Sequence, residues 1–322
     1  MSGRGWSVPA LGAPRVATAA DIPRLNALFT QAFTDRYRRD GMVGVRVPPL
    51  GVQVWRYALE DAGAGALCWE DAQGQLAAFN IVHRSGAEGW MGPLCVRPDL
   101  QGGGVGRVVV QAGVAWLQAQ GATSIGLETM PRTMDNIGFY TRLGFVPGRL
   151  TLTVTLEAAR TASGLTLLSR LSAARQEAAL AGCRALTAQL APAVDFTREL
   201  EITARLAVGD TVILGPPEAP EAFALCHTAP LVDGRAQEEL RVLKVACATA
   251  EQFPELLGVL ARYARAAGMQ RVAVRLQGEY PEALRSAVEL GGRLRWTDLR
   301  MSRHDAPERG AVSGVVLSNW EI

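Results

Sequence analysis

The chain has 322 residues, 48% of them hydrophobic and 20% charged, which is typical of about two soluble domains of ordinary size. Its formal net charge of +2 is too small to indicate a nucleic-acid binder or a polybasic membrane protein. No apolar stretch is long enough for a membrane-spanning helix, so we expect neither nucleic acid nor a membrane as a partner.

Lysine is almost absent: Lys244 is the only lysine among the 33 lysine and arginine residues. Walker A loops, protein kinases and pyridoxal phosphate enzymes each depend on a lysine in a defined sequence context. Lys244 lies in an apolar segment, 241–245, that is typical of a strand and has no glycine-rich loop before it. The sequence therefore excludes these three classes.

The cysteines and histidines give no sign of a disulfide framework or a metal centre. The cysteines are odd in number and far apart, which favours a reducing compartment, so we expect a cytoplasmic protein. No two histidines have metal-ligand spacing, and we expect no metal site. These residues are Cys68, Cys95, Cys183, Cys226, Cys247, His83, His227 and His304.

The first predicted element is an amphipathic helix that begins at Thr18, where Thr18 and Asp21 form a capping-box pattern. From residue 34 to 56 the pattern is irregular, and Pro48-Pro49 breaks any helix. This basic segment is either a solvated surface or a rim for an acceptor that carries a carboxylate or phosphate. Its arginines are Arg36, Arg38, Arg39, Arg46 and Arg56.

The next segments predict strands that lead into a glycine turn and a helix, followed by a strand, a short helix and a final pair of strands. A turn at 71–74 joins the first two strands into a hairpin. Pro147-Gly148 divides the final pair. In chain order the elements are strands at 66–70, 75–83 and 90–96, the glycine turn at 101–107, a helix from 108, a strand at 124–128, a helix at 135–142 and the strand pair at 145–156.

The second half of the chain repeats the first after a shift of 147 positions, which pairs Gly121 with Gly268 and Gly144 with Gly291. The order of the predicted elements is preserved in this register. We expect an α+β (α/β) chain with two copies of one fold, each a mixed, mostly antiparallel sheet flanked by helices. The predicted parts are a mobile tail at 1–13, a first domain at 14–157, a helical segment at 158–190 and a second domain at 191–322.

The glycine turn is a candidate anion site. Between a strand and a helix, such a turn directs several backbone N–H groups at one point beyond the helix N-terminus. Each charge-assisted contact contributes on the order of 1.5–3 kcal/mol, so a few of them hold a pyrophosphate without lysine. We expect Gly104 and Gly106 to be small for this approach. The turn lacks the complete G-x-G-x-x-G of a dinucleotide fold.

Two sequence blocks, about 40 residues apart, are specific enough to indicate a family. The first is Val96-Arg97-Pro98 followed by Gln101-Gly102-Gly103-Gly104-Val105-Gly106. The second, at 135–145, contains Asn136 and Tyr140 and ends in Gly144-Phe145. Together they resemble the signature of the GNAT superfamily of acyl-CoA-dependent N-acyltransferases, in a tandem form with a degenerate C-terminal copy.

The resemblance implies acetyl-CoA as the co-substrate. Its pantetheine arm would pair with the third strand and contact Asn136, and its pyrophosphate would lie at the glycine turn. Tyr140 takes the place of the general acid, since a phenol of pKa about 10 suits a leaving thiolate whose conjugate acid has a pKa of about 8.5. The implied cofactor-binding residues are Leu94, Cys95, Val96, Gln101, Gly102, Gly103, Gly104, Val105, Gly106, Arg107 and Asn136.

The general base is left open by the sequence. The family often places a Glu on the strand before Val-x-Pro, but residues 90–95 contain no carboxylate. Glu88, Glu128 and His83 are candidates, and a water relay is an equal alternative. Cys95 has apolar neighbours, which favours a buried thiol with a raised pKa over a nucleophile.

The second copy has lost every matched functional position. In the 147 register Gly104 becomes Glu251 and Tyr140 becomes Ala287, so we expect no acyl-CoA binding there. This copy would pack against the first or shape the acceptor pocket. Residues 311–322 alternate like an additional strand at the edge of either sheet.

These inferences predict an N-acetyltransferase that moves an acetyl group from acetyl-CoA to a primary amine by direct attack, with the N-terminal domain active. The acceptor would be a small molecule or a peptide, and the protein a monomer or homodimer. Two alternatives are a non-catalytic acyl-CoA-binding sensor or scaffold and a tandem acetyltransferase similar to mycothiol synthase.

Overall fold

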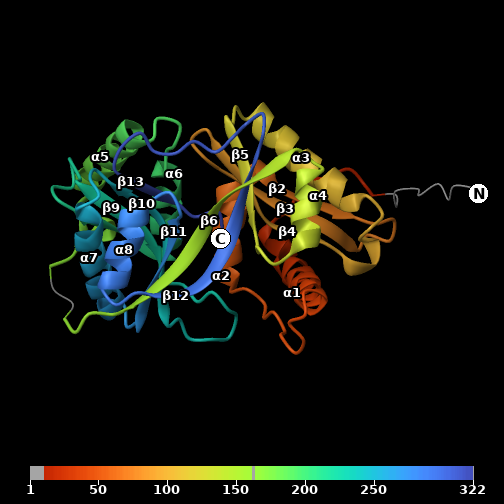
Figure 1. The fold of residues 1–322 in the computed structure, drawn as a ribbon, viewed down its shortest axis with the longest axis horizontal. Helices are drawn as coiled ribbons and strands as arrows, with labels where there is room; N and C mark the ends of the chain where they lie inside the picture. The colour runs from red at the N-terminus through yellow and green to blue at the C-terminus, as the bar shows by residue number, and fades with distance from the viewer. Residues whose placement is uncertain (1–10, 162–163, 322) are drawn as a thin grey trace, which may run out of the picture.

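The computed structural model describes residues 11–161 and 164–321, and in these ranges the strands join into one continuous sheet. Figure 1 shows two halves side by side, with long strands crossing between them. In sheet order the strands are β1 (Arg15–Val16), β2 (Ala66–Glu70), β3 (Leu76–Ser85), β4 (Glu88–Val96), β5 (Ser124–Thr129), β12 (Arg293–Arg303), β6 (Phe145–Glu157), β11 (Arg271–Gln277), β10 (Glu239–Cys247), β9 (Ala222–His227), β8 (Gly209–Leu214) and β7 (Thr166–Leu167), with β13 (Val315–Ser318) also pairing with β10.

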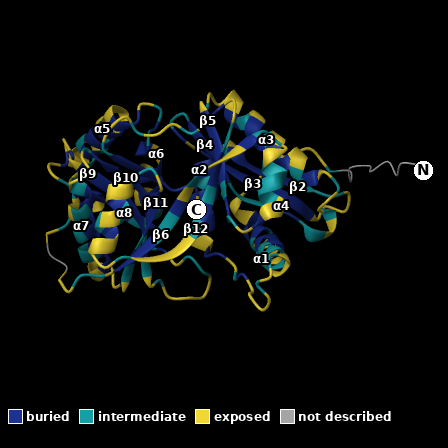
Figure 2. Ribbon diagram, viewed as in Figure 1, coloured by how far each residue is buried: buried dark blue, intermediate teal, exposed yellow. Residues whose placement is uncertain are grey.

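Helices cover both faces of this sheet, and four clusters of buried apolar side chains lie between helices and strands. In Figure 2 the strands beneath the helices are largely buried. No helix of the described ranges is apolar over a length that would cross a membrane. The helices are α1 (Ile22–Arg39) and α2 (Val52–Ala62) on one face of the first half, α3 (Val105–Ala119) and α4 (Met134–Thr141) on its other face, and α5 (Ala173–Leu190), α6 (Thr197–Leu206), α7 (Gln252–Ala266) and α8 (Pro281–Glu289) in the second half.

The start of the fold follows the sequence pattern closely. Thr18 and Asp21 form the predicted capping box, although the first turn is a 3-10 helix, Ala19–Asp21, that continues into α1. The predicted hairpin of β2 and β3 is also confirmed. Most of the expected N-terminal tail falls on residues 1–10, outside the described residues.

The internal repeat is confirmed element by element. Shifting the bounds of α3 by 147 positions gives residues 252–266, which are the bounds of α7. The same shift places β5 within β11 and α4 within α8. Each half also contains one parallel pair of strands, β4 with β5 and β10 with β11. The two halves are therefore two copies of one mixed, mostly antiparallel fold.

The prediction of two strands at 145–156 is wrong, because β6 is a single strand of 13 residues. Its first part pairs only with β12, and β11 joins on its other side from Thr151 onward. Pro147 thus lies where only one side of β6 forms a ladder, opposite a register shift in β12 between Leu299 and Met301, and a proline is tolerated there. Because β12 also pairs with β5, the last strand of each copy lies within the sheet of the other.

Candidate active site

The first copy contains an open fork between two parallel strands. β4 and β5 pair only from Glu88 to Met91 with Ser124 to Leu127, and beyond that point they separate. Leu94, Cys95 and Val96 continue to pair with β3 on the far side. Among the described residues, no strand pairs with them on the fork side. The free edge there can accept an amide-bearing ligand as an additional strand.

The glycine turn lies at the open end of this fork. β4 leads through a short 3-10 helix, Pro98–Leu100, into the turn, and α3 begins at Val105. Gly102 and Gly104 adopt left-handed backbone conformations, with φ of +80° and +89°. The first-turn N–H groups of a helix have no acceptor within the helix and lie at its positive end. The turn and the start of α3 therefore have the backbone arrangement that the predicted anion site requires.

Close packing between two helices gives a further reason for a glycine at position 106. A Cβ at this position would lie 3.2 Å from Cζ of Phe139, on α4. The glycine therefore allows α3 and α4 to pack closely. That packing fixes α4, which carries Asn136 and Tyr140, against the helix that begins at the anion site.

The C-terminal end of α1 spans the open end of the fork. On the β4 side, Nη1 of Arg39 donates to Oε1 of Gln101 at 3.1 Å. On the β5 side, Arg132 donates to the backbone oxygen of Asp40 at 2.7 Å, and Thr133 donates to its carboxylate at 2.9 Å. The segment 34–56 is accordingly not irregular throughout, because α1 continues to Arg39 and α2 begins at Val52.

Three of the five arginines of this segment are paired with nearby carboxylates. Arg36 binds Asp40, and Arg39 binds Asp35 at 2.7 Å. Arg38 lies 4.0 Å from Asp35. These pairs offset the charges of three of the five arginines, whereas Arg46 and Arg56 are exposed, and the rim hypothesis stays a prediction.

Tyr140 and Cys95 are both protonated at neutral pH, as a general acid and a buried thiol should be. Tyr140 packs against Phe139 and Phe145, with ring centroids 5.1 and 6.0 Å away. Burial and the proximity of Cys95 raise the pKa of Tyr140 to about 12, so it is a phenol at neutral pH and can donate a proton. Burial also raises the pKa of the Cys95 thiol well above its usual value, which removes Cys95 as a nucleophile. Asn136 lies one helical turn before Tyr140.

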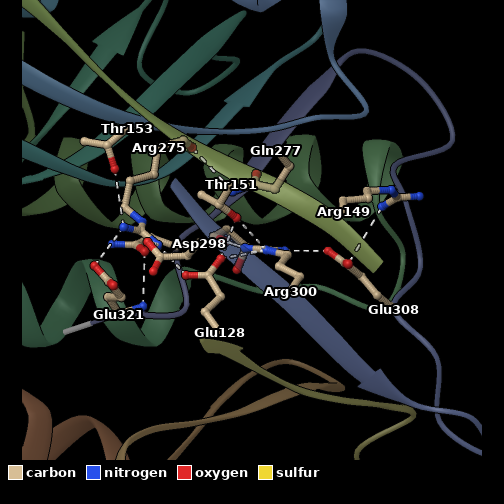
Figure 3. Close-up of polar contacts among 12 residues, drawn as sticks. Glu128, Arg149, Thr151, Thr153, Arg275, Gln277, Asp298, Arg300, Glu308 and Glu321 are labelled. Atoms are coloured by element: carbon tan, nitrogen blue, oxygen red, sulfur yellow. Dashed lines mark hydrogen bonds and ion pairs between the residues drawn. The ribbon is translucent and has the colours of Figure 1, made fainter. Parts of the chain in front are cut away.

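Glu128 is not available as a general base. Its carboxylate accepts hydrogen bonds from Thr151 at 2.6 Å, from Arg300 at 2.9 Å and from Arg275 at 2.5 Å (Figure 3). Burial alone would raise the pKa of Glu128, but the two guanidinium groups lower it to about 2. The carboxylate is thus fixed in its ionised form and joins β5 to β11 and β12.

The other two predicted bases are also engaged in structural contacts. His83 is fully buried, stacks on Trp90 and lies with its Nδ1 2.5 Å from Oδ2 of Asp61 on α2. Glu88 is buried and accepts a hydrogen bond from Ser318 at 2.5 Å. None of the bases that we expected from the sequence is therefore free to act at the fork.

The corresponding fork of the second copy is filled by the chain itself. β10 pairs with β11 only up to Val242, and from Lys244 to Cys247 it pairs instead with β13 in antiparallel register. The strand expected within residues 311–322 is therefore present, and it occupies the place that is open in the first copy. Phe253, at the position matched to Gly106, is fully buried in the core.

Comparisons with known proteins agree with this architecture. Residues 27–145 match the model of the acetyltransferase (GNAT) family. A search of curated proteins found no significant match. Among solved structures, a putative acetyltransferase from Pyrococcus horikoshii is similar over 98% of this chain and 96% of its own, with 14% identity and a TM-score of 0.66.

Two further structures are similar over almost the whole chain. A tandem GNAT protein from the clavulanic acid biosynthesis pathway has 12% identity and a TM-score of 0.59, with 93% of this chain and 100% of that chain covered. N-myristoyltransferase from Saccharomyces cerevisiae, with bound myristoyl-CoA, has 10% identity and a TM-score of 0.62, with 97% and 90% covered. These likenesses show a tandem GNAT fold.

Proposed function

We propose that this protein is an N-acetyltransferase whose one working site is the fork of the first copy, because residues 27–145 match the model of the acetyltransferase (GNAT) family. The observation that carries the proposal is the open β4–β5 fork with a glycine turn at its end. Acetyl-CoA would add its pantetheine arm to the edge at Leu94–Val96 and place its pyrophosphate at the N-terminus of α3. Asn136 would contact the same arm.

In the proposed reaction, the acceptor nitrogen attacks the thioester carbonyl carbon directly. A C–N bond forms, the C–S bond breaks, and the departing thiolate takes the proton of the Tyr140 hydroxyl. The phenolate then recovers a proton from the nitrogen of the new amide, so one amine and one thioester give one amide and one thiol. A phenol whose pKa is raised to about 12 donates its proton only as charge develops on sulfur.

The direct test uses acetyl-CoA with a panel of primary amines that includes a monoamine, a diamine, an amino sugar and a peptide N-terminus. Acetylated product and free CoA in equal amounts support the proposal. Wild-type protein that binds acetyl-CoA but acetylates none of these amines favours the second candidate function, a non-catalytic acyl-CoA sensor. The observation behind that candidate is that Glu88, Glu128 and His83 all have structural partners.

Tyr140→Phe tests the acid. We expect kcat to fall by about 10²–10⁴-fold, the usual range for loss of a positioned acid, while the Kd for acetyl-CoA stays within about twofold. The ring contacts with Phe139 and Phe145 do not depend on the hydroxyl. Single-turnover kinetics and calorimetry measure the two quantities. An unchanged kcat would remove Tyr140 from the mechanism.

A further inference from the structure

We propose that the C-terminal segment Asn319–Glu321 forms the acceptor side of the first fork, and that the carboxylate of Glu321 takes the proton from an acceptor that enters as a primary ammonium ion. This inference rests on the proposed acetyltransferase function. It assigns the second copy a role in the first site, because the second copy holds the segment in place.

The segment is anchored where it leaves the second fork. β13 ends at Ser318, and the backbone N–H of Asn319 donates to Leu243 at 2.9 Å. Lys244 donates to the hydroxyl of Ser318 at 3.0 Å and to the backbone oxygen of Asn319 at 3.2 Å. Ser318 donates in turn to Glu88, on β4 of the first copy. The chain therefore passes from the second fork to the first along a path with fixed contacts.

Trp320 lies at the point where the first fork opens. A Cβ on Gly126, which pairs with β4, would overlap the indole ring, and a Cβ on Gly92 would lie 3.6 Å from the backbone oxygen of Trp320. The Arg300 guanidinium lies 4.0 Å from the ring centroid on another side. The indole is 1% exposed, yet its N–H has no acceptor among the described residues, which leaves a buried donor beside the opening.

The segment lies on the face of the sheet that carries α1. Leu127 and Met301 point into the core beneath α3, so Glu128 and Arg300, their neighbours in β5 and β12, point to the opposite face. Trp320 packs against Arg300 on that face. The glycine turn begins α3, which places the predicted anion site and the segment on opposite sides of the fork.

Glu321 follows Trp320 and is partly exposed. Its carboxylate lies 2.8 Å from Nη1 of Arg275, on β11, and its side chain is 49% exposed (Figure 3). Its backbone N–H donates to the side chain of Asn319 at 3.1 Å. Burial raises the pKa of Tyr37, on the α1 helix that spans the fork, and the charges of Glu321 and Asp298 raise it further. A partly exposed carboxylate therefore directly follows the residue that lies where the fork opens.

Charged groups on β5, β10, β11 and β12 act on this carboxylate. The surrounding protein desolvates the carboxylate although half of the side chain is exposed, and this raises the pKa of Glu321 to about 7. Asp298 on β12 and Glu128 on β5 also raise this pKa, whereas Arg275 and Arg241 lower it. A carboxylate whose pKa is near 7 suits an amine whose own pKa is about 10, because a large share of the carboxylate is ionised at neutral pH and can still accept a proton.

In the step that we propose, the acceptor ammonium transfers one proton to the Glu321 carboxylate, and the nitrogen lone pair then attacks the thioester carbon. The proton on Glu321 passes to solvent through its exposed side. The other proton transfers are those of the proposed reaction: Tyr140 protonates the thiolate and is reprotonated by the amide nitrogen. The net products are the amide, CoA as a thiol and one proton.

Glu321→Gln is the decisive variant, and Glu289→Gln on the exposed end of α8 is its matched control. With an amine that the wild type acetylates, we expect kcat/KM of Glu321→Gln to fall by at least about 100-fold at pH 7. In the wild type, kcat/KM should rise about tenfold per pH unit up to a pH near 7. In Glu321→Gln this rising limb of the pH profile should disappear. The Kd for acetyl-CoA and the thermal unfolding midpoint should match those of the control.

Glu321→Asp keeps the carboxylate on a shorter side chain and should retain the rising limb with a smaller loss. A Glu321→Gln profile equal to the wild type overturns the inference while leaving the proposed function intact. Equal losses in Glu321→Gln and Glu321→Asp, both without the limb, also overturn it. A wild type that acetylates no amine contradicts the proposed function instead.

Discussion

Glutamate in place of Gly104 is expected to raise the Kd for acetyl-CoA by at least about 100-fold. A side-chain carboxylate at the start of α3 places a negative charge where the pyrophosphate would bind, and it opposes the attraction of the backbone N–H groups. The left-handed φ of +89° adds a strain of about 1–2 kcal/mol for any residue with a Cβ. Isothermal calorimetry with acetyl-CoA measures the effect.

Gly121→Glu separates charge from backbone strain. Gly121 has a φ of +78°, and nothing lies within 4 Å of a Cβ added there. It follows the other end of the same helix, α3. We expect both variants to lose similar thermal stability, and only Gly104→Glu to lose acetyl-CoA affinity. Wild-type affinity in Gly104→Glu would show that the pyrophosphate does not lie at this turn.

The parts of the site that the sequence predicted are those set by local chemistry. A glycine turn between a strand and a helix determines where N–H groups point, and the residues of one short helix fix how Asn136 and Tyr140 are spaced. The repeat is apparent in the sequence because the turn after each matching helix needs a left-handed residue, and both copies have a glycine there: Gly144 with φ +86° and Gly291 with φ +87°. These features depend on neighbours within a few residues in the chain.

The parts that could not be predicted depend on pairing between distant segments. The pattern of β6 specifies a strand but not its partner, and β12 lies more than 130 residues further along the chain. β13 fills the second fork through backbone hydrogen bonds, which carry almost no sequence signal. The motifs of the first copy likewise do not indicate Glu321, which lies in the second copy. Gly126 and Gly92 have no evident reason to be glycine in the sequence, and the structure shows that both lie against Trp320.

Lys244→Met is expected to lower the free energy of unfolding by about 3–5 kcal/mol at pH 8, because it leaves a buried carboxylate without its ammonium partner. Lys244 is 3% exposed, and its Nζ lies 3.8 Å from Glu199 and 3.3 Å from Ser85. Ser85 belongs to β3 of the first copy, whereas Glu199 and Lys244 belong to the second. The one lysine of the chain thus joins the two copies.

The loss should depend on pH in a defined direction. Burial raises the pKa of Glu199 to about 7 even though Lys244 opposes the shift, and removal of Lys244 raises it further. Between the ordinary glutamate pKa of about 4.3 and this higher value, the folded protein binds more protons than the unfolded one, so stability falls as pH rises. Urea unfolding of Lys244→Met should therefore show a smaller deficit at about pH 5.5 than at about pH 8.

The double variant Lys244→Met with Glu199→Gln identifies the source of that dependence. A neutral amide cannot be ionised, so the difference between the deficits at the two pH values should largely disappear, while the lost contacts to Ser318 and Asn319 remain in both variants. A deficit in Lys244→Met that is equal at both pH values would assign the effect to those contacts. The unpaired charge of Glu199 would then contribute little to the joint between the copies.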